Sequence, residues 1–261
     1  MSAEPCLSGH ASVSLDGTTK KRKKSSRSRQ RDRNSPSPPP TLIERTNALA
    51  LEDLKSRFLD TSLLTFTQPY NDAAQRYSIE LYTSSSLPEA VFNDCFDVLE
   101  ANMSPAYKAT SIGWHPRKKK EEMKHPAMRY LVLTADGGEE SSSSSGSGIF
   151  VGFLEFMITE EEGSEVIYTY ELDLVASYQK QGLGKRLLDV AEAFGEKVGV
   201  EKAMLTVFDS NKGARKFYER EGYDIDEISP EPKILRNGLV KPSTYHILSK
   251  PFKKTTKVGN T

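Results

Sequence analysis

Two hydrophobic periods alternate along the chain between residues 41 and 252. Short apolar runs with a period of two predict strands, and apolar residues three or four apart predict amphipathic helices. After an initial helix the order is β-α-β-β-β-α-β-α-β-β, which predicts an α/β fold with a mixed central sheet of about seven strands flanked by helices. The predicted helices cover residues 41–54, 87–103, 183–198 and 211–221, and the predicted strands cover residues 77–81, 128–134, 149–158, 168–175, 203–208, 223–228 and 244–249.

Three segments lack this patterning. Residues 1–40 are rich in Ser, Pro, Lys and Arg and hold almost no large apolar side chain, so we expect a disordered basic tail. Residues 137–148 are mostly Gly and Ser and are expected to form a flexible loop between two strands, and residues 253–261 a flexible C-terminal tail. Residues 41–252 are then expected to form a single domain.

The formal net charge of zero conceals an uneven distribution. The first 40 residues hold nine Lys or Arg and three acids, whereas the rest of the chain holds 27 basic and 33 acidic residues. The basic run at residues 20–24, followed by four more arginines, has the density of a nuclear-import signal, or it is a solvated tail with no receptor. The acidic body disfavours direct binding to nucleic acid and favours basic partners.

The sequence contains two cysteines, Cys6 and Cys95, which are too few for a disulfide framework and favour an intracellular protein. No apolar run approaches the roughly 20 residues needed to cross a bilayer, and residues 1–9 lack the pattern of a signal peptide. We therefore expect a soluble monomer without membrane contact. A nuclear-import reading of the basic run predicts a nuclear and cytoplasmic location.

One stretch combines a strand, a glycine-punctuated turn and a helix. Residues 168–175 form an apolar and aromatic run, residues 179–184 read Gln-Lys-Gln-Gly-Leu-Gly, and apolar residues at helical spacing follow. The two glycines let backbone N–H groups approach an anion, and the helix start presents unpaired N–H groups and the positive end of its dipole. Such a turn can hold a pyrophosphate, although glycine here is also ordinary punctuation between a strand and a helix.

A second stretch, residues 211–223, reads Asn-Lys-Gly-Ala-Arg-Lys-Phe-Tyr-Glu-Arg-Glu-Gly-Tyr and follows the next predicted strand. Together the two stretches resemble the acyl-CoA site of the GNAT acetyltransferase superfamily, whose patterns are Gln/Arg-x-x-Gly-x-Gly/Ala and Asn-x-x-Ala-x-x-x-Tyr-x-x-x-Gly-Phe/Tyr. The resemblance implies a GNAT fold with its sheet splayed at the acetyl-CoA site, acetyl-CoA as cosubstrate and no metal. It also implies coenzyme contacts from Tyr170, Leu172, Leu174, Gln179, Lys180, Gln181, Gly182, Leu183, Gly184 and Asn211.

Two residues are candidates for proton transfer. Glu171 lies on the predicted central strand beside the expected thioester, where a carboxylate can accept the proton of an attacking amine directly or through water; the alternative is a surface glutamate. An α-amino group, with a pKa of about 7.7–8.0, needs less help than a lysine at about 10.4. Tyr218 matches the tyrosine that protonates the departing CoA thiolate in family members, or it only packs on the coenzyme.

Further stretches resemble NatD, the GNAT subfamily of N-terminal acetyltransferases selective for histones whose tails begin Ser-Gly-Arg-Gly. They include Gly113-Trp114, Glu121-Glu122-Met123 and Tyr168-x-Tyr170-Glu171. This resemblance implies N-α-acetylation of the N-terminal tails of histones, with Glu171 essential. Where the subfamily has a peptide-contacting tryptophan this chain has Ile112, and where it has an acid this chain has Thr159, so Glu160 is the candidate substitute. The implied peptide contacts are Tyr107, Tyr168, Tyr170, Thr206 and Tyr245.

The arginine of such a peptide requires a carboxylate partner, for which Glu160, Glu161, Glu162 and Asp226 are candidates at strand ends. The charged run at residues 117–122 is typical of a solvated helical face, and we assign it no function. Two other functions stay open at this point. One is a GNAT enzyme acting on lysine side chains or on broader protein N-termini, and the other is a non-catalytic acyl-CoA sensor.

Overall fold

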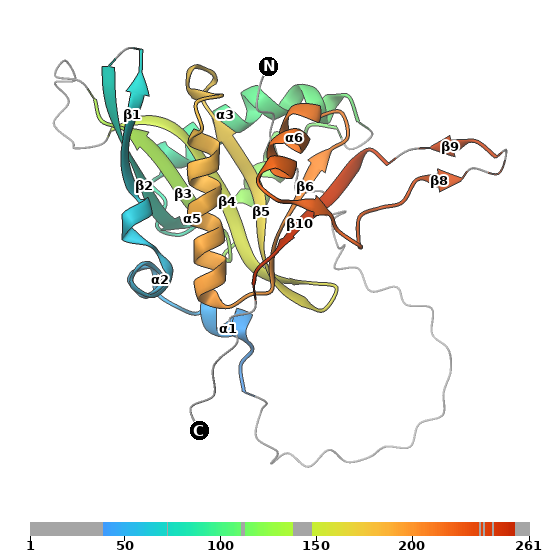
Figure 1. The fold of residues 1–261 in the computed structure, drawn as a ribbon, viewed down its shortest axis with the longest axis horizontal. Coiled ribbons are helices and arrows are strands. Elements are labelled where there is room, and N and C mark those ends of the chain that lie inside the picture. Colours follow the sequence, from blue (N-terminus) through green and yellow to red (C-terminus); the bar gives the residue numbers. More distant parts are fainter. Residues whose placement is uncertain are drawn as a thin grey trace.

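The computed structural model describes residues 39–71, 73–110, 113–137, 148–234, 236, 238–241 and 243–253. They form one eight-stranded mixed sheet with helices on both faces (Figure 1). The order is β1-β2-β3-β4-β5-β6-β10-β7, in which β5 and β6 pair parallel and the other neighbours pair antiparallel. The strands are β1 (Thr65–Tyr70), β2 (Ala73–Thr83), β3 (Arg129–Ala135), β4 (Ile149–Glu161), β5 (Ser164–Leu174), β6 (Lys202–Phe208), β7 (Asp224–Ile225) and β10 (Tyr245–Pro251).

The predicted mixed α/β sheet is confirmed, and it has one strand more than the sequence pattern indicated. The missed strand is β1, which contains Pro69. A proline cannot donate to the sheet ladder and is tolerated here because β1 lies at the sheet edge. The strand predicted at residues 223–228 is reduced to the two residues of β7. A separate hairpin of β8 (Lys233–Ile234) and β9 (Val240–Lys241), which was not predicted, projects from the body (Figure 1).

Helices cover the two faces of the sheet unequally. On one face lie α1 (Leu42–Asn47), α2 (Leu51–Phe58), α5 (Leu183–Val198) and α6 (Lys212–Arg220), and on the other lie α3 (Glu89–Lys108) and α4 (Pro116–Met123). Two short 3-10 turns, η1 (Thr61–Leu63) and η2 (Ala176–Tyr178), complete the set. The helix predicted at residues 87–103 is therefore present but longer, and α4 contains the charged run at residues 117–122 that was interpreted as a solvated helical face.

The predicted helix over residues 41–54 is instead two helices. Thr41 caps α1 with the expected capping box, because its hydroxyl accepts the N–H of Glu44 and the Glu44 carboxylate accepts the N–H of Thr41. The helix stops at Asn47, whose carbonyl accepts a hydrogen bond from Arg129 and whose side chain donates to the carbonyl of Ile158. A contact with strands far away in the sequence thus replaces the next intrahelical bond.

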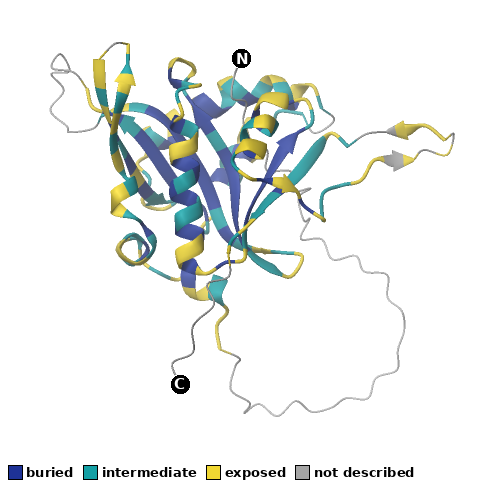
Figure 2. Cartoon of the chain, in the orientation of Figure 1, coloured by how far each residue is buried: buried dark blue, intermediate teal, exposed yellow. Residues whose placement is uncertain are grey.

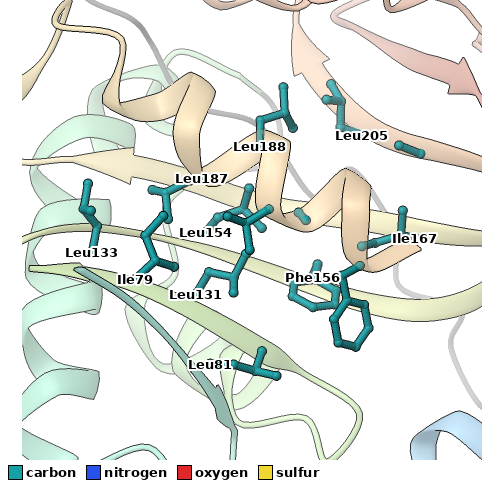
Figure 3. Close-up of a cluster of buried hydrophobic side chains, with 14 of the residues drawn as sticks. Ile79, Leu81, Leu131, Leu133, Leu154, Phe156, Ile167, Leu187, Leu188 and Leu205 are labelled. Atoms are coloured by element: carbon teal, nitrogen blue, oxygen red, sulfur yellow. The ribbon is translucent and has the colours of Figure 1, made fainter. Parts of the chain in front are cut away.

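The larger core lies between the sheet and α5. The central strands are buried along most of their length (Figure 2). Leu183, Leu187, Leu188, Ala191 and Phe194 form the buried stripe of α5, as their helical spacing predicted. Figure 3 shows Leu187 and Leu188 among side chains from β3, β4 and β5. This packing fixes α5 across the sheet and thereby fixes the turn that precedes it.

The predictions for the basic tail and for the Gly/Ser loop concern residues that lie almost entirely outside the described part of the chain. This holds for residues 1–38, for residues 138–147 and for residues 254–261. The departure noted at Ile112 also lies outside it. In the described ranges, no helix is long and apolar enough to cross a membrane.

Candidate active site

Strands β5 and β6 pair along only part of their length. Their register runs from Val166 opposite Lys202 to Thr169 opposite Leu205 and then ends. At the same point the pairing of β4 with β5 shifts by one residue, so that Tyr170 is an extra residue in β5. The second half of β5 is therefore bound to β4 and not to β6, and the sheet opens beside residues 170–174, as the predicted splay requires.

A groove of about 510 Å³ lies on the α5 side of this opening. Its floor includes Leu172 and Leu174 of β5, and its walls come from the turn before α5 and from α6. Lys180 and Gly182 in that turn have positive φ values of 63° and 82°. The lining residues are Leu172, Leu174, Gln179, Lys180, Gly182, Gly184, Lys185, Gly213, Lys216, Phe217, Tyr218, Arg220 and Glu221. We call this the α5–α6 groove.

The α5–α6 groove fits a ligand that carries phosphates. Gly182 has no side chain with which to cap α5, and the first intrahelical bond runs from the N–H of Arg186 to the carbonyl of Gly182. The N–H groups of the first turn therefore have no partner within the helix. Four basic side chains lie among the lining residues, those of Lys180, Lys185, Lys216 and Arg220. Backbone donors and basic side chains thus line the same groove, and one of these side chains, Lys185, is ion-paired with Asp189 and Glu221.

The predicted coenzyme residues, Tyr170 excepted, either line the α5–α6 groove or support it. Leu172, Leu174, Gln179, Lys180, Gly182 and Gly184 line the α5–α6 groove. The others support it: Gln181 binds the carbonyl of Ser177 through its side-chain amide, the Leu183 side chain is buried in the core, and Asn211 caps α6 by accepting the N–H of Ala214 at 2.9 Å. Tyr170 packs on the opposite face of the sheet.

Tyr218 is almost completely buried and lines the groove from α6. Its ring contacts those of Phe217 and Tyr223 edge-on, with centroid distances of 4.9 and 5.7 Å. Both of the roles considered for it, proton donor and packing residue, are compatible with this position.

Three carboxyl groups are buried on the other face of β4 and β5. Glu171 is fully buried and lies directly opposite Glu155 in the strand register, and Asp173 follows two residues along β5. Burial raises the pKa of Glu155 to about 8 and that of Asp173 to about 7, and it raises the pKa of Glu171 well above the usual value. Asp173 accepts a hydrogen bond of 2.9 Å from the Asn102 side chain on α3. We call Glu155, Glu171 and Asp173 the carboxyl cluster.

Lys119 of α4 contacts this cluster, which corrects the interpretation of residues 117–122 as a solvated face. Its side chain is 5% exposed, and its Nζ lies 2.5 Å from Glu171 Oε1 and 2.6 Å from Glu122 Oε1. Burial lowers the pKa of Lys119, but the charge of Glu171 together with the nearby Tyr107, Glu122 and Glu155 outweighs it and holds the pKa well above the usual value. Met123 four residues later is also buried, and this i, i+4 pair is the signal in the sequence that could have identified the inward face.

The predicted peptide-contacting residues come together beside the carboxyl cluster. The Tyr168 hydroxyl and Thr206 Oγ1 are 2.5 Å apart, and the rings of Tyr168 and Tyr170 have centroids 5.3 Å apart. Tyr107 contacts Phe208 at the same centroid distance, and Phe208 lies opposite Tyr245 in the register of β6 and β10. We call Tyr107, Trp114, Tyr168, Tyr170, Phe208 and Tyr245 the aromatic cluster.

Glu160 was expected to replace the acid that the subfamily has at the position of Thr159. In the structure the Glu160 side chain faces away from the aromatic cluster. Glu160 is exposed and lies opposite Glu165 in the register of β4 and β5. Because side chains alternate along a strand, Glu160 lies on the same face of β4 as Ile158, which belongs to the larger core. Glu161 lies on the aromatic face. Burial and then the charge of Glu161 raise the pKa of Tyr170. Asp226, another candidate, is held by Lys202 at 2.6 Å.

Among the described residues, no group of three or more His, Cys, Asp or Glu side chains could hold a metal ion.

Residues 95–223 match the acetyltransferase (GNAT) family. The chain is similar to N-alpha-acetyltransferase 40 of Saccharomyces cerevisiae, with 27% identity over 168 residues that cover 55% of each chain. It is also similar to an uncharacterised N-acetyltransferase of Bacillus subtilis, with 27% identity over 84 residues, 32% of this chain and 54% of the other. The chain thus matches about half the length of these curated relatives.

Among solved structures, the GNAT domain of Streptomyces lividans PAT aligns with 74% of this chain and 99% of its own, at 14% identity and a TM-score of 0.48.

Proposed function

The chain has the GNAT acetyltransferase fold, and from this premise we propose that it transfers acetyl from acetyl-CoA to the N-terminal amine of proteins. The α5–α6 groove would hold the coenzyme, with the turn at Lys180 and Gly182 and the start of α5 on its phosphates. Leu172 and Leu174 would border the pantetheine arm. Acetyl-CoA supplies an activated thioester, and the steps below concern what the side chains of this chain do.

The observation that carries the proposal is the position of Glu171 relative to the groove. Leu172 and Leu174 point into the groove on one face of β5, whereas Glu171, the residue directly before Leu172, points to the other face. The strand has no β6 partner at this point. An acyl donor on one side and an amine on the other can therefore meet across the opening, with Glu171 beside the amine.

Glu171 would act as the general base. An amine attacks a carbonyl only in its neutral form, and an α-amino group with a pKa of about 7.7–8.0 needs a base of modest strength. The raised pKa of the Glu171 carboxyl brings it closer to that range. As the amine bonds to the acetyl carbon, its proton passes to Glu171, directly or through water, and the thiolate leaves. Tyr218, on the groove side, is the candidate donor of a proton to that thiolate.

We further propose histone tails beginning Ser-Gly-Arg-Gly as the substrates. The tyrosines of the aromatic cluster could enclose small first and second residues with apolar ring faces, and Thr206 could bind the peptide backbone. Glu161, at the end of β4 on the same face, is the candidate partner for the arginine. The similarity to a yeast N-alpha-acetyltransferase supports an N-terminal amine as the acceptor. The basic run at residues 20–24 supports a nuclear as well as a cytoplasmic location.

One assay tests this proposal. The purified protein is given labelled acetyl-CoA and the peptide Ser-Gly-Arg-Gly-Lys, either with a free N-terminus or with a blocked one, and the acetylated position is located by mass spectrometry. The proposal expects label on the N-terminal amine of the free peptide and none on the blocked one. Label on the lysine of both peptides would identify a lysine acetyltransferase instead.

A further inference from the structure

Lys119 links the buried carboxyl cluster to the surface. Its ammonium group lies within 2.6 Å of two carboxylates, Glu171 on the inner side and Glu122 on the outer side. Glu122 is 38% exposed, whereas Glu171 has no exposed surface. The Lys119 ammonium also lies 5.9 Å from the centre of the Tyr107 ring. The lysine therefore occupies a built position between α3, α4 and β5.

This position addresses a problem that the sheet creates for Glu171. A buried carboxyl group favours its neutral form, and neighbouring carboxylates strengthen that preference. Glu155 faces Glu171 across the strand pair, and Asp173 lies two residues along the same strand. A general base must nevertheless be an anion when the amine arrives. The Lys119 ammonium 2.5 Å away favours that anion.

We propose that Lys119 is a positioning residue that holds Glu171 in the ionised form and orients its carboxylate toward the opening between β5 and β6. The inference rests on the proposed function, in which Glu171 is the base. Lys119 does not take the proton itself. Its charge also disfavours a protonated amine beside Glu171, so both effects favour a neutral amine next to a charged base.

The groups around Glu171 decide what happens when the lysine is removed. They come from every element packed at this place, and after loss of Lys119 all of them are neutral or acidic. They are Cys95 and Tyr107 on α3, Glu122 on α4, Tyr130 on β3, Glu155 on β4 and Asp173 on β5. Removal of Lys119 should therefore raise the pKa of Glu171 further.

The first test is the pH profile of kcat/KM for peptide acetylation in Lys119→Met, which keeps an unbranched side chain and removes the charge. The acidic limb should move to higher pH by about 1–3 units, the effect expected for loss of one close opposite charge. Activity should approach that of the wild type above the new limb. Lys119→Arg should keep the limb near its original place. Lys118→Met, at an exposed position of the same helix, is the matched control and should leave the limb unchanged.

A limb that stays in place in Lys119→Met, with rates lower by one factor at every pH, would overturn the proposal and leave Lys119 a structural residue.

A second test does not depend on activity. Urea unfolding of Lys119→Met, Glu171→Gln and the double variant forms a double-mutant cycle. Lys119→Met alone should lower the urea midpoint, because a buried carboxylate loses its partner, and adding Glu171→Gln should restore most of the loss. If the losses of stability in the two single variants add up to the loss in the double variant, the ion pair is refuted. If the wild type acetylates no amine, the proposed function fails, whereas the cycle still reports on the pair.

Discussion

Glu155 allows a test of the carboxyl cluster that needs no substrate. The side chain is fully buried, and burial, opposed in part by Lys119, raises the pKa of its carboxyl to about 8. In an unfolded chain a glutamate has a pKa of about 4.3. Between these two values the native protein holds a proton that the unfolded protein has released. The free energy of unfolding therefore falls as the pH rises through this window.

The magnitude follows from the linkage relation. One group that is protonated only in the native state lowers the free energy of unfolding by up to about 1.4 kcal/mol for each pH unit. Between pH 5.5 and 7.5 the loss from Glu155 is then about 2–3 kcal/mol. Asp173, whose pKa burial raises to about 7, adds to the slope below that pH.

Glu155→Gln should remove the part of this slope that belongs to Glu155, because glutamine does not titrate. Relative to the wild type, the variant should gain about 2 kcal/mol of stability on going from pH 5.5 to 7.5. The measurement is urea unfolding at pH 5.5, 6.5 and 7.5, with Glu160→Gln as the control at an exposed position of the same strand. A wild type whose stability rises over this range, or a Glu155→Gln slope equal to that of the wild type, would refute the reasoning.

Two further predictions concern ligand binding. Gly182→Val should lower acetyl-CoA affinity at least about tenfold, measured by calorimetry, because Gly182 has a φ of 82° and lies in the α5–α6 groove. Gly199→Val, at the other end of α5 with a φ of 94°, imposes similar strain and should leave the affinity unchanged; equal losses would mean that strain alone is responsible. Glu161→Gln should lower kcat/KM for Ser-Gly-Arg-Gly about 10- to 100-fold with little effect on Ser-Gly-Ala-Gly, as expected for a charge-assisted hydrogen bond of about 1.5–3 kcal/mol. A larger effect from Glu160→Gln would return the role to Glu160.

The order of the main helices and strands could be predicted because each has a clear period in its apolar residues or ends at clear turn residues. The helical spacing of the buried residues of α5 predicts the helix, and Gly182 directly before it marks where the helix begins. The parallel pair β5 and β6 follows from the helix that connects them. The four tyrosines of the aromatic cluster were predicted from a resemblance, and the structure brings them together from α3, β5 and β10; Trp114 and Phe208 are additions that the structure shows.

Other features depend on contacts that no local pattern reveals. The break between α1 and α2 coincides with a hydrogen bond from Arg129, more than 80 residues away, to the Asn47 carbonyl. Lys119 lies in a run of charged residues on a helix of eight residues, so burial of one of them depends on what α3 and β5 place beneath it. The choice between Glu160 and Glu161 depends on a strand register, and a shift of one residue exchanges the two faces.

The kcat of Glu171→Gln at saturating acetyl-CoA and Ser-Gly-Arg-Gly peptide tests whether Glu171 is the base of an acetyl transfer. The amide keeps the shape of the side chain but cannot accept the proton. We expect kcat to fall about 10²–10⁴-fold with acetyl-CoA affinity nearly unchanged. A kcat close to that of the wild type, with only KM for the peptide raised, would show that Glu171 binds substrate and is not the base.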